Sequence, residues 1–289
     1  MNHSRRLLRP WKRPVALRFP PPILHERYAL EQEVGHGGSA RVYRAWDLRR
    51  RLPVALKRAH LSQQDGEALC YEAELLSALR HPALPAFVEY FEEGGRAYLV
   101  ETWMAGTTLT HRRAVSVPQA LWIGCQLCDV LTYLHRHHLV HRDLAPGNIL
   151  LADNQQTLAL LDLGQARLFL PSPHLNDAPA LLDRQAGTPG YVAPEQWEEG
   201  IVSPAADIYG LGMVLGCALT MCPPSLVVAA SSFTQVVDDP RDLSPAMTQV
   251  LRLCDQMIAW HPEHRPTLAD VSQALIHLQT DLPSTRERA

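Results

Sequence analysis

The sequence lacks a strong excess of charge of either sign. Its 27 lysines and arginines nearly balance 30 aspartates and glutamates, which leaves a formal net charge of −3. Proteins that are drawn to nucleic acid or to an anionic membrane by their overall field carry a clear positive charge. The composition therefore argues against nucleic acid as a partner.

Cysteine is scarce too, with six residues among 289. So few cysteines do not build a disulfide framework in a chain of this size, and we expect a hydrophobic core to hold the fold. Cys125 and Cys128 have the C-x-x-C spacing of redox and zinc sites, but no second pair or histidine cluster accompanies them. Both fall on one face of a helix predicted over about residues 118–135, so we interpret them as part of a buried helical face.

A long unbroken apolar run is also missing. The stretch from Ile208 to Val237 has no charged residue, but Pro223 and Pro224 interrupt it after 15 residues. A helix of that length spans about 22 Å, whereas the hydrocarbon core of a bilayer is about 30 Å thick. We therefore expect a buried core helix here and no transmembrane segment.

The first 25 residues contain no acidic residue. Six basic residues stand there among five prolines: Arg5, Arg6, Arg9, Lys12, Arg13 and Arg18. No apolar segment of the secretory type accompanies them, so a cytoplasmic location is favoured. We interpret residues 1–25 as a solvated arm, and contact with an anionic or protein surface is the alternative.

Hydrophobic periodicity divides the rest of the chain into two parts. Strands are predicted at 28–34, 41–46, 53–57, 87–92 and 96–102, with a helix over about 66–79. After Gly106 the pattern is mostly helical. The sequence predicts an α+β fold with a small strand-rich lobe at about 26–104 and a larger helical lobe at about 105–280. A short tail over 281–289 follows, and no sensor domain is expected after the last helix.

A glycine-rich turn lies between the first two predicted strands. Gly35 and Gly37 belong to the pattern G-x-G-x-x-A-x-V, in which Ala40 replaces a third glycine. Glycines let backbone N–H groups approach phosphate oxygens closely. This turn alone is a weak indication of a phosphate site.

A lysine at the end of an apolar strand strengthens that indication. Lys57 follows Val54-Ala55-Leu56, and Glu72 lies on the predicted helix, from which its carboxylate can hold the ammonium against phosphate oxygens. Glu74 is the competing partner, on a face about 200° around the helix. Glu72 is favoured because it lies nine residues before His81.

The run from His141 to Asn148 carries the strongest signal. In H-R-D-L-A-P-G-N, the carboxylate of Asp143 can receive a hydroxyl proton and the amide of Asn148 can hold a metal ion. Asp162, in the later D-L-G, supplies a second oxygen ligand of the kind that Mg²⁺ prefers. Chance rarely produces these three residues in this order and at this spacing.

These motifs resemble those of the eukaryotic-type (Hanks-type) Ser/Thr protein kinase family, in particular its bacterial members. The resemblance covers roughly residues 28–278 and includes G-T-P-G-Y-V-A-P-E at 187–195, D-I-Y-G-L-G at 207–212 and W-H-P-E-H-R-P at 260–266. It implies the two-lobed protein kinase fold and transfer of the γ-phosphate of ATP to serine or threonine hydroxyls of a protein substrate.

The resemblance also implies roles for individual residues. Lys57 would contact the α- and β-phosphates and Glu72 would orient it, while Asp143 would be the catalytic base or hydroxyl-orienting group. Asn148 and Asp162 would bind Mg²⁺. Nucleotide-binding residues would be Gly35, Gly37, Ala40, Val42, Ala55, Lys57 and Leu150, with Val42, Ala55 and Leu150 enclosing the adenine. Structural residues would be Leu76, His141 and Leu163 in an apolar column, the Glu195–Arg265 pair, and Asp207.

Two positions depart from the family pattern. Ala145 stands where Ser/Thr kinases carry a lysine that stabilises charge on the transferring group, so the chemistry is expected to be slowed by about 10²-fold or more. Glu101 falls either at the usually apolar gatekeeper position or, after a shift of one residue, at the usual acid of the interlobe hinge. The sequence leaves both placements open.

Specificity and regulation follow from three further positions. Thr188 lies where Ser/Thr kinases hydrogen-bond the catalytic loop, which supports serine and threonine as acceptors. Arg142 is at the position that normally receives an activating phosphate. Ser172 is the only hydroxyl residue between Gly164 and Gly187, so activation by phosphorylation is the weaker expectation.

Two other functions compete with an active protein kinase. Ala145 and Glu101 favour a pseudokinase, which acts as a nucleotide-binding scaffold, whereas the full set of catalytic residues favours an enzyme. A small-molecule phosphotransferase of related fold is the third possibility. It would have no use for the peptide-binding segment at 187–195.

Overall fold

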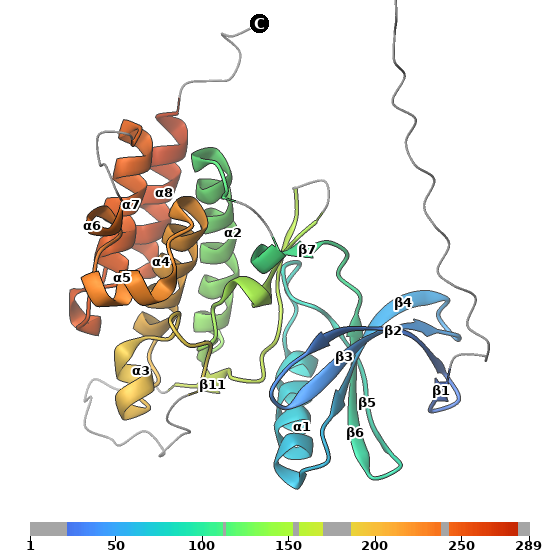
Figure 1. Ribbon diagram of the computed structural model, residues 1–289. Coiled ribbons are helices and arrows are strands. Elements are labelled where there is room, and N and C mark those ends of the chain that lie inside the picture. Colours follow the sequence, from blue (N-terminus) through green and yellow to red (C-terminus); the bar gives the residue numbers. More distant parts are fainter. Residues whose placement is uncertain (1–21, 112–113, 153–155, 170–185, 238–242, 283–289) are drawn as a thin grey trace, which may run out of the picture.

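The computed structural model describes residues 22–111, 114–152, 156–169, 186–237 and 243–282. Two lobes lie side by side in Figure 1, one built from a curled sheet with helix α1 and the other mainly from helices. The predicted α+β fold with a strand-rich lobe followed by a helical lobe is therefore confirmed.

Six strands within the described residues form one antiparallel sheet, in the order β1-β2-β3-β4-β6-β5. They are β1 (Ile23–Leu24), β2 (Tyr28–His36), β3 (Ala40–Asp47), β4 (Leu52–Ala59), β5 (Phe87–Glu93) and β6 (Arg96–Thr102). All but β1 lie where strands were predicted. The two residues of β1 precede the expected start of the lobe at residue 26, and so short a strand has no periodicity to recognise.

The two faces of this sheet are used differently, because side chains alternate along each strand. Leu56 and Val100 point to one face, where they join a small core with Tyr28. Leu99 points to the other face and joins the main core with Leu76 of α1. Lys57 shares that second face, since it pairs with Leu99 in the register of β4 and β6.

Helix α1 (Gln63–Ala78) begins at Ser62, whose Oγ accepts a hydrogen bond from the backbone N–H of Asp65 at 3.1 Å. Its buried residues are three or four apart and therefore lie on one face of the helix. They are Leu69, Glu72, Ala73 and Leu76. The same face that packs on the sheet thus carries one carboxylate into the interior, where it requires a partner.

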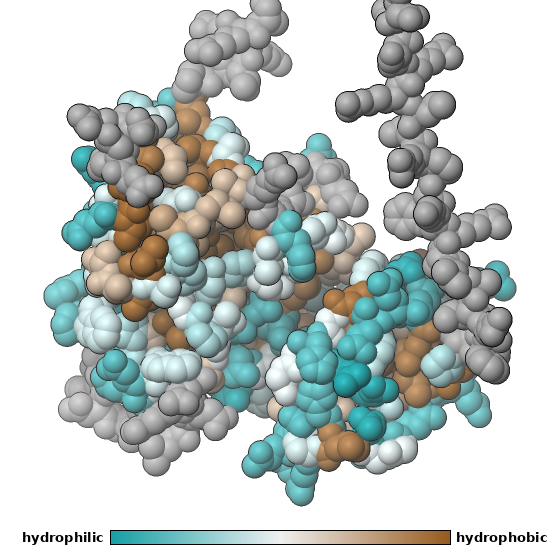
Figure 2. Space-filling model, viewed as in Figure 1, coloured by the Kyte–Doolittle hydropathy of each residue, from teal (hydrophilic) through white to brown (hydrophobic). Residues whose placement is uncertain are grey.

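The helical lobe is organised around α4 (Pro204–Thr220), in which nearly every residue is buried. Its other helices are α2 (Val117–Arg136), α3 (Pro194–Glu199), α5 (Pro224–Ala230), α6 (Phe233–Val236), α7 (Pro245–Met257) and α8 (Leu268–Thr280). Gly216 lets α4 approach α6 closely, because a Cβ there would lie 2.2 Å from Cζ of Phe233. Cys128 of α2 is buried in this core and Cys125 packs against it. Figure 2 shows hydrophobic residues gathered on this lobe and a mostly hydrophilic surface over the strands.

Helix α4 is the predicted buried helix of the uncharged stretch. In the described part of the chain, no single helix is long and apolar enough to span a bilayer. Helices α4 and α5 meet the length and composition expected of a membrane span only when they are taken together. The chain bends by 114° between them.

Short strands and turns fill the region between the lobes. They are β7 (Thr107–Thr108), η1 (Leu109–His111), β8 (Leu139–Val140), η2 (Pro146–Asn148), β9 (Ile149–Leu151), β10 (Leu158–Leu160) and β11 (Arg167–Leu168), with η4 (Pro262–His264) before α8. Strand β9 pairs with both β10 and β7. Gly106, just before β7, permits the close approach, because a Cβ there would lie 2.3 Å from the carbonyl oxygen of Leu151.

Candidate active site

Lys57 lies at the centre of a charge cluster in which Lys57 and Glu72 are buried and the side chain of Asp162 is 51% exposed. Its Nζ donates a hydrogen bond to Oε1 of Glu72 at 2.5 Å and lies 3.5 Å from Oδ1 of Asp162. Strand β4 carries Lys57, helix α1 carries Glu72, and Asp162 follows β10. Glu74, the competing partner, is exposed on α1. Three segments far apart in the sequence thus place one cation between two carboxylates at the junction of the lobes.

Burial and charge shift the pKa values of this cluster. Burial alone would lower the pKa of Lys57, but the carboxylates of Asp162, Glu101 and Glu72 raise it well above 10.5. The Lys57 ammonium lowers the pKa of Asp162 below its usual value of 3.8. Burial raises the pKa of Glu72 to about 7, and Lys57 opposes this shift. Lys57 therefore keeps its positive charge in the cleft.

Glu72 also ties α1 to the segment that carries Asp162. Its Oε1 accepts a second hydrogen bond, from the backbone N–H of Leu163 at 3.1 Å. Asp162 has a left-handed φ of 63°, a conformation that costs a non-glycine residue about 1 to 3 kcal/mol. The N–H of Gly164 donates to Oδ1 of Asp162 at 3.1 Å. The position of the helix and the orientation of Asp162 are thereby coupled.

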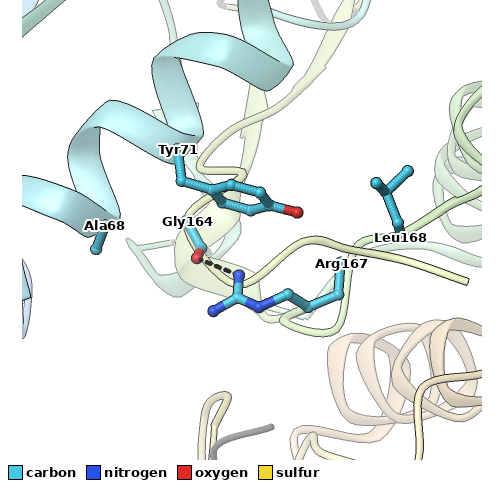
Figure 3. Close-up of a pocket in the computed structure, with 5 residues that line it drawn as sticks. All are labelled: Ala68, Tyr71, Gly164, Arg167 and Leu168. Atoms are coloured by element: carbon cyan, nitrogen blue, oxygen red, sulfur yellow. Dashed lines mark hydrogen bonds between the residues drawn. The ribbon is translucent and has the colours of Figure 1, made fainter. Parts of the chain in front are cut away.

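A second contact between α1 and this segment is drawn in Figure 3. The guanidinium of Arg167 lies 5.1 Å from the centroid of the Tyr71 ring and donates a hydrogen bond to the carbonyl of Gly164 at 3.1 Å. These three residues line a cavity of about 390 Å³, together with Ala68 and Leu168. Because Tyr71 directly precedes Glu72, the contact supports α1 beside the carboxylate that holds Lys57.

Asp143 is held by hydrogen bonds at both carboxylate oxygens. The backbone N–H and the hydroxyl of Thr188 each donate to Oδ1 at 2.7 Å, and Nδ2 of Asn148 donates to Oδ2 at 2.8 Å. Since the amide nitrogen of Asn148 faces Asp143, its Oδ1 is the atom that could hold a metal ion. The carboxylate orientation is fixed before any substrate arrives.

Asp207, at the N-terminal end of α4, holds the catalytic loop from behind. Its carboxylate accepts hydrogen bonds from the backbone N–H groups of His141 and Arg142, each at 2.9 Å, and from Nε2 of His135 at 2.8 Å. Burial would raise the pKa of Asp207, but the bonds and the charge of the histidines lower it below 3.8. The left-handed φ of 67° at Arg142 is one strained position that these bonds maintain.

The segment at 187–195 is anchored to the helical lobe. Nη1 and Nη2 of Arg265 donate to the two carboxylate oxygens of Glu195 at 2.7 and 2.8 Å, and both side chains are buried. Nε2 of Gln196 bridges the carbonyls of Arg142 and Ala186, at 2.8 Å each. Gln196 was not singled out from the sequence, because a buried glutamine beside A-P-E has no recognisable motif.

The residues expected to enclose adenine come from both lobes. Val42 pairs with Lys57 across β3 and β4, so their side chains share one face of the sheet. Ala55, two residues before Lys57, points to the same face. Leu150 approaches from β9, and a Cβ on Gly106 would lie 2.6 Å from its Cδ2. The structure thus places apolar surfaces on both sides of the junction.

The glycine-rich turn closes over the end of the same strands. Gly35 pairs with Val42, and the N–H of Gly37 donates to the carbonyl of Ala40 at 2.9 Å. Ala40 itself lies on β3, paired with Ala59. The replacement of the third glycine therefore falls in regular strand, where alanine fits.

The structure decides between the two placements of Glu101. Glu101 lies inside β6, pairs with Ala55 and is 4% exposed. Thr102 ends the strand, and its Oγ1 accepts a hydrogen bond from the N–H of Ala86 at 2.9 Å. Glu101 therefore occupies the buried gatekeeper position, and Thr102 stands where the hinge acid was considered.

A cavity of about 460 Å³ opens beside the catalytic loop. Ala145, Asn148 and Thr188 line one side of it, and Met221 and Pro224 line the other. The lining that the structure describes contains no charged residue. The described lining of the space next to Ala145 is thus uncharged.

A comparison with known protein families identifies the family of this chain. Residues 28–277 match the protein kinase domain. The chain belongs to the protein kinase family. Family membership implies the use of ATP and of a divalent metal ion, and it agrees with the motifs at Lys57, Asp143 and Asp162.

The kinase domain is similar to several bacterial proteins. It is 32% identical to the DNA damage-responsive serine/threonine-protein kinase RqkA of Deinococcus radiodurans, over 93% of this chain and 42% of that protein. It is 31% identical to the serine/threonine-protein kinase PknB of Mycolicibacterium smegmatis, over 89% of this chain and 44% of that protein. Serine/threonine-protein kinase C of Synechocystis is 27% identical, over 92% and 52%. The chain thus spans about half the length, or less, of these relatives.

Some expectations fall on parts of the chain that the structure does not describe. Ser172 lies in the undescribed range 170–185, and nearly all of the basic arm lies in 1–21. Within the kinase domain, the residues that sequence reasoning missed are Tyr71, Arg167, Gln196 and His135. Each acts through packing or through hydrogen bonds to other segments, for which spacing gives no signal.

Proposed function

We propose that this kinase domain transfers the γ-phosphate of ATP to serine and threonine hydroxyls of protein substrates, with Mg²⁺ as the metal ion. The observation that carries the proposal is that two groups are preorganised, Lys57 in the strand-rich lobe and Asp143 in the helical lobe. Lys57 is held by Glu72 beside Asp162 on one side, and Asp143 is held by Thr188 on the other. A scaffold that only recognises shape does not require both.

Charge and accessibility indicate which residues would bind the nucleotide. Lys57 offers an ammonium to phosphate oxygens, and the turn at Gly35 and Gly37 lets the backbone approach them without obstructing side chains. Asp162 and Asn148 offer the oxygen ligands that Mg²⁺ prefers. When bound, the metal ion neutralises charge on the phosphates. These residues hold the nucleotide in line with an acceptor.

The acceptor side is organised by Asp143. Its carboxylate is aimed by Thr188 and Asn148, so it can orient an acceptor hydroxyl and receive its proton. Correct orientation of the two reactants supplies much of the rate in phosphoryl transfer. The adjoining cavity beside Ala145 gives a peptide chain room to approach. The relatives' names, which specify serine and threonine, support the same acceptor class.

The test is phosphate transfer from Mg·ATP to a generic protein substrate. Asp162→Ala and Lys57→Met are each expected to abolish transfer, since they remove a metal ligand and the phosphate-binding cation. Both variants should unfold cooperatively by circular dichroism, as the unaltered domain does. Transfer that continues unchanged in Lys57→Met would contradict the assignment of this site.

A second candidate is a nucleotide-binding scaffold without transfer activity. It is favoured by the uncharged lining of the cavity at Ala145, where the family pattern places a lysine. The same assay separates the two functions: a scaffold binds Mg·ATP but gives no transfer, and Asp162→Ala then changes binding alone.

A further inference from the structure

One histidine binds the glycine-rich turn at two points. The backbone N–H of His60 donates a hydrogen bond to the carbonyl of Ser39 at 3.0 Å, and Nε2 of its ring lies 3.1 Å from the carbonyl oxygen of Gly37. A carbonyl oxygen only accepts, so Nε2 carries the proton of this second bond. His60 therefore holds the turn on both sides of Gly38.

The turn keeps backbone N–H groups available for a ligand. The N–H of Gly37 donates to the carbonyl of Ala40 at 2.9 Å. The N–H groups of Gly38 and Ser39 donate to no group in the described part of the chain. Successive N–H groups of this kind can bind the oxygens of a phosphate.

The strand register shows from which side His60 reaches the turn. His36 pairs with Arg41, and Arg41 pairs with Arg58. Because Arg58 directly follows Lys57 on β4, these paired side chains point to the face opposite Lys57. The centroid of the His60 ring lies 5.4 Å from that of the His36 ring. His60 thus contacts the turn from the face that is turned away from Lys57.

The peptide bond links this contact to the direction of an N–H group. The carbonyl of Gly37 and the N–H of Gly38 belong to one planar trans peptide, so they point in opposite directions. With the carbonyl held toward His60, the N–H of Gly38 points to the side of Lys57. Two groups that can bind phosphate, this N–H and the ammonium of Lys57, are thereby directed to the same face of the sheet.

We propose that His60 is a positioning residue of the nucleotide site, which holds the glycine-rich turn so that the N–H of Gly38 binds a phosphate oxygen of ATP. The inference rests on the proposed function. His60 lies outside the glycine-rich pattern, three residues after Lys57, and in this role it does not touch the nucleotide. Its contribution is therefore to the affinity for the phosphates and not to the affinity for the nucleoside.

The experiment compares a triphosphate with its nucleoside. Dissociation constants of adenylyl imidodiphosphate, a non-hydrolysable ATP analogue, and of adenosine are measured on the whole chain with Mg²⁺ by calorimetry. His60→Met removes the ring donor and keeps a side chain of similar size. The loss of one hydrogen bond should weaken binding of the triphosphate by about 3- to 10-fold and change that of adenosine by less than about 2-fold. Unchanged binding of the triphosphate would overturn the inference, and so would equal losses for both ligands.

His60→Gln tests whether the hydrogen bond is what positions the turn. The amide nitrogen of glutamine is a donor at about the reach of Nε2, and it is uncharged at any pH. The preference for the triphosphate over adenosine should return to that of the unaltered protein. A preference as low as that of His60→Met would show that the charge or shape of the ring acts instead, and the inference would be wrong.

His36→Met is the matched control, because it removes the neighbouring imidazole, whose side chain is 59% exposed. It should keep the preference of the unaltered protein. A loss equal to that of His60→Met would assign the effect to the pair of rings and contradict the role of the His60 hydrogen bond. Thermal unfolding shows that each variant is folded before it is titrated. If neither ligand binds the unaltered protein, the proposed function fails; if both bind and His60→Met keeps the preference, only the role of His60 fails.

Discussion

Replacement of Asp207 by asparagine tests how the catalytic loop is held. An amide has one acceptor oxygen where the carboxylate has two, so at least one of the buried N–H groups of His141 and Arg142 loses its acceptor. An unsatisfied buried group costs about 1 to 3 kcal/mol, and the charged character of the bond from His135 is lost as well. We expect Asp207→Asn to lower the free energy of unfolding by about 2 to 4 kcal/mol at pH 7.

The pH dependence of this difference has a definite sign. The pKa of Asp207 in the folded protein lies below its usual 3.8, so the ionised form stabilises the fold above that value. The stabilisation is lost as the pH falls through the folded pKa. The difference between the original protein and Asp207→Asn should be present at pH 5 and shrink below about pH 4.

Urea unfolding followed by circular dichroism measures both effects. Asp129→Asn is the matched control, because the side chain of Asp129 is 72% exposed on α2, and it should change stability by less than about 0.5 kcal/mol. The reasoning is refuted if Asp207→Asn also changes stability by less than about 0.5 kcal/mol at pH 7.

Three further outcomes are expected. Ala145→Lys should leave transfer unchanged or raise it, by up to about 10²-fold, because the adjoining cavity has room for the chain; a sharp loss in steady-state turnover would show that the loop requires a small residue. Tyr71→Ala should lower kcat by about 2- to 5-fold, since it removes a contact with Arg167 worth about 0.5 to 1 kcal/mol; unchanged kcat would show that the contact does not support α1. Glu195→Ala should cost about 3 to 5 kcal/mol in urea unfolding, because Arg265 stays buried without its carboxylate; a loss below about 1 kcal/mol contradicts this.

The sequence predicted the features that depend on a fixed spacing between residues. Lys57 ends an apolar strand, and Asp143 and Asn148 are five residues apart. Glu72 could be chosen over Glu74 because it lies nine residues before His81. Long strands and helices were found within a few residues of their ends for the same reason, since periodicity accumulates with length.

The rest depends on contacts that spacing does not record. Glu101 could not be placed, because a shift of one residue in a strand moves a side chain to the opposite face. Arg167 and Gln196 bind groups that are distant in the sequence, and Gly106 is required only because Leu151 comes within 2.3 Å of where its Cβ would be. Two-residue strands such as β1 have no period at all.

One carboxylate oxygen of helix α1 connects two other segments of the domain. Oε1 of Glu72 receives both the ammonium of Lys57 and the N–H of Leu163, so rotation of α1 breaks both bonds in a single step. Graded intermediate positions of the helix are thereby disfavoured. A displacement of α1 would therefore change the support of Lys57 and the position of Leu163 together.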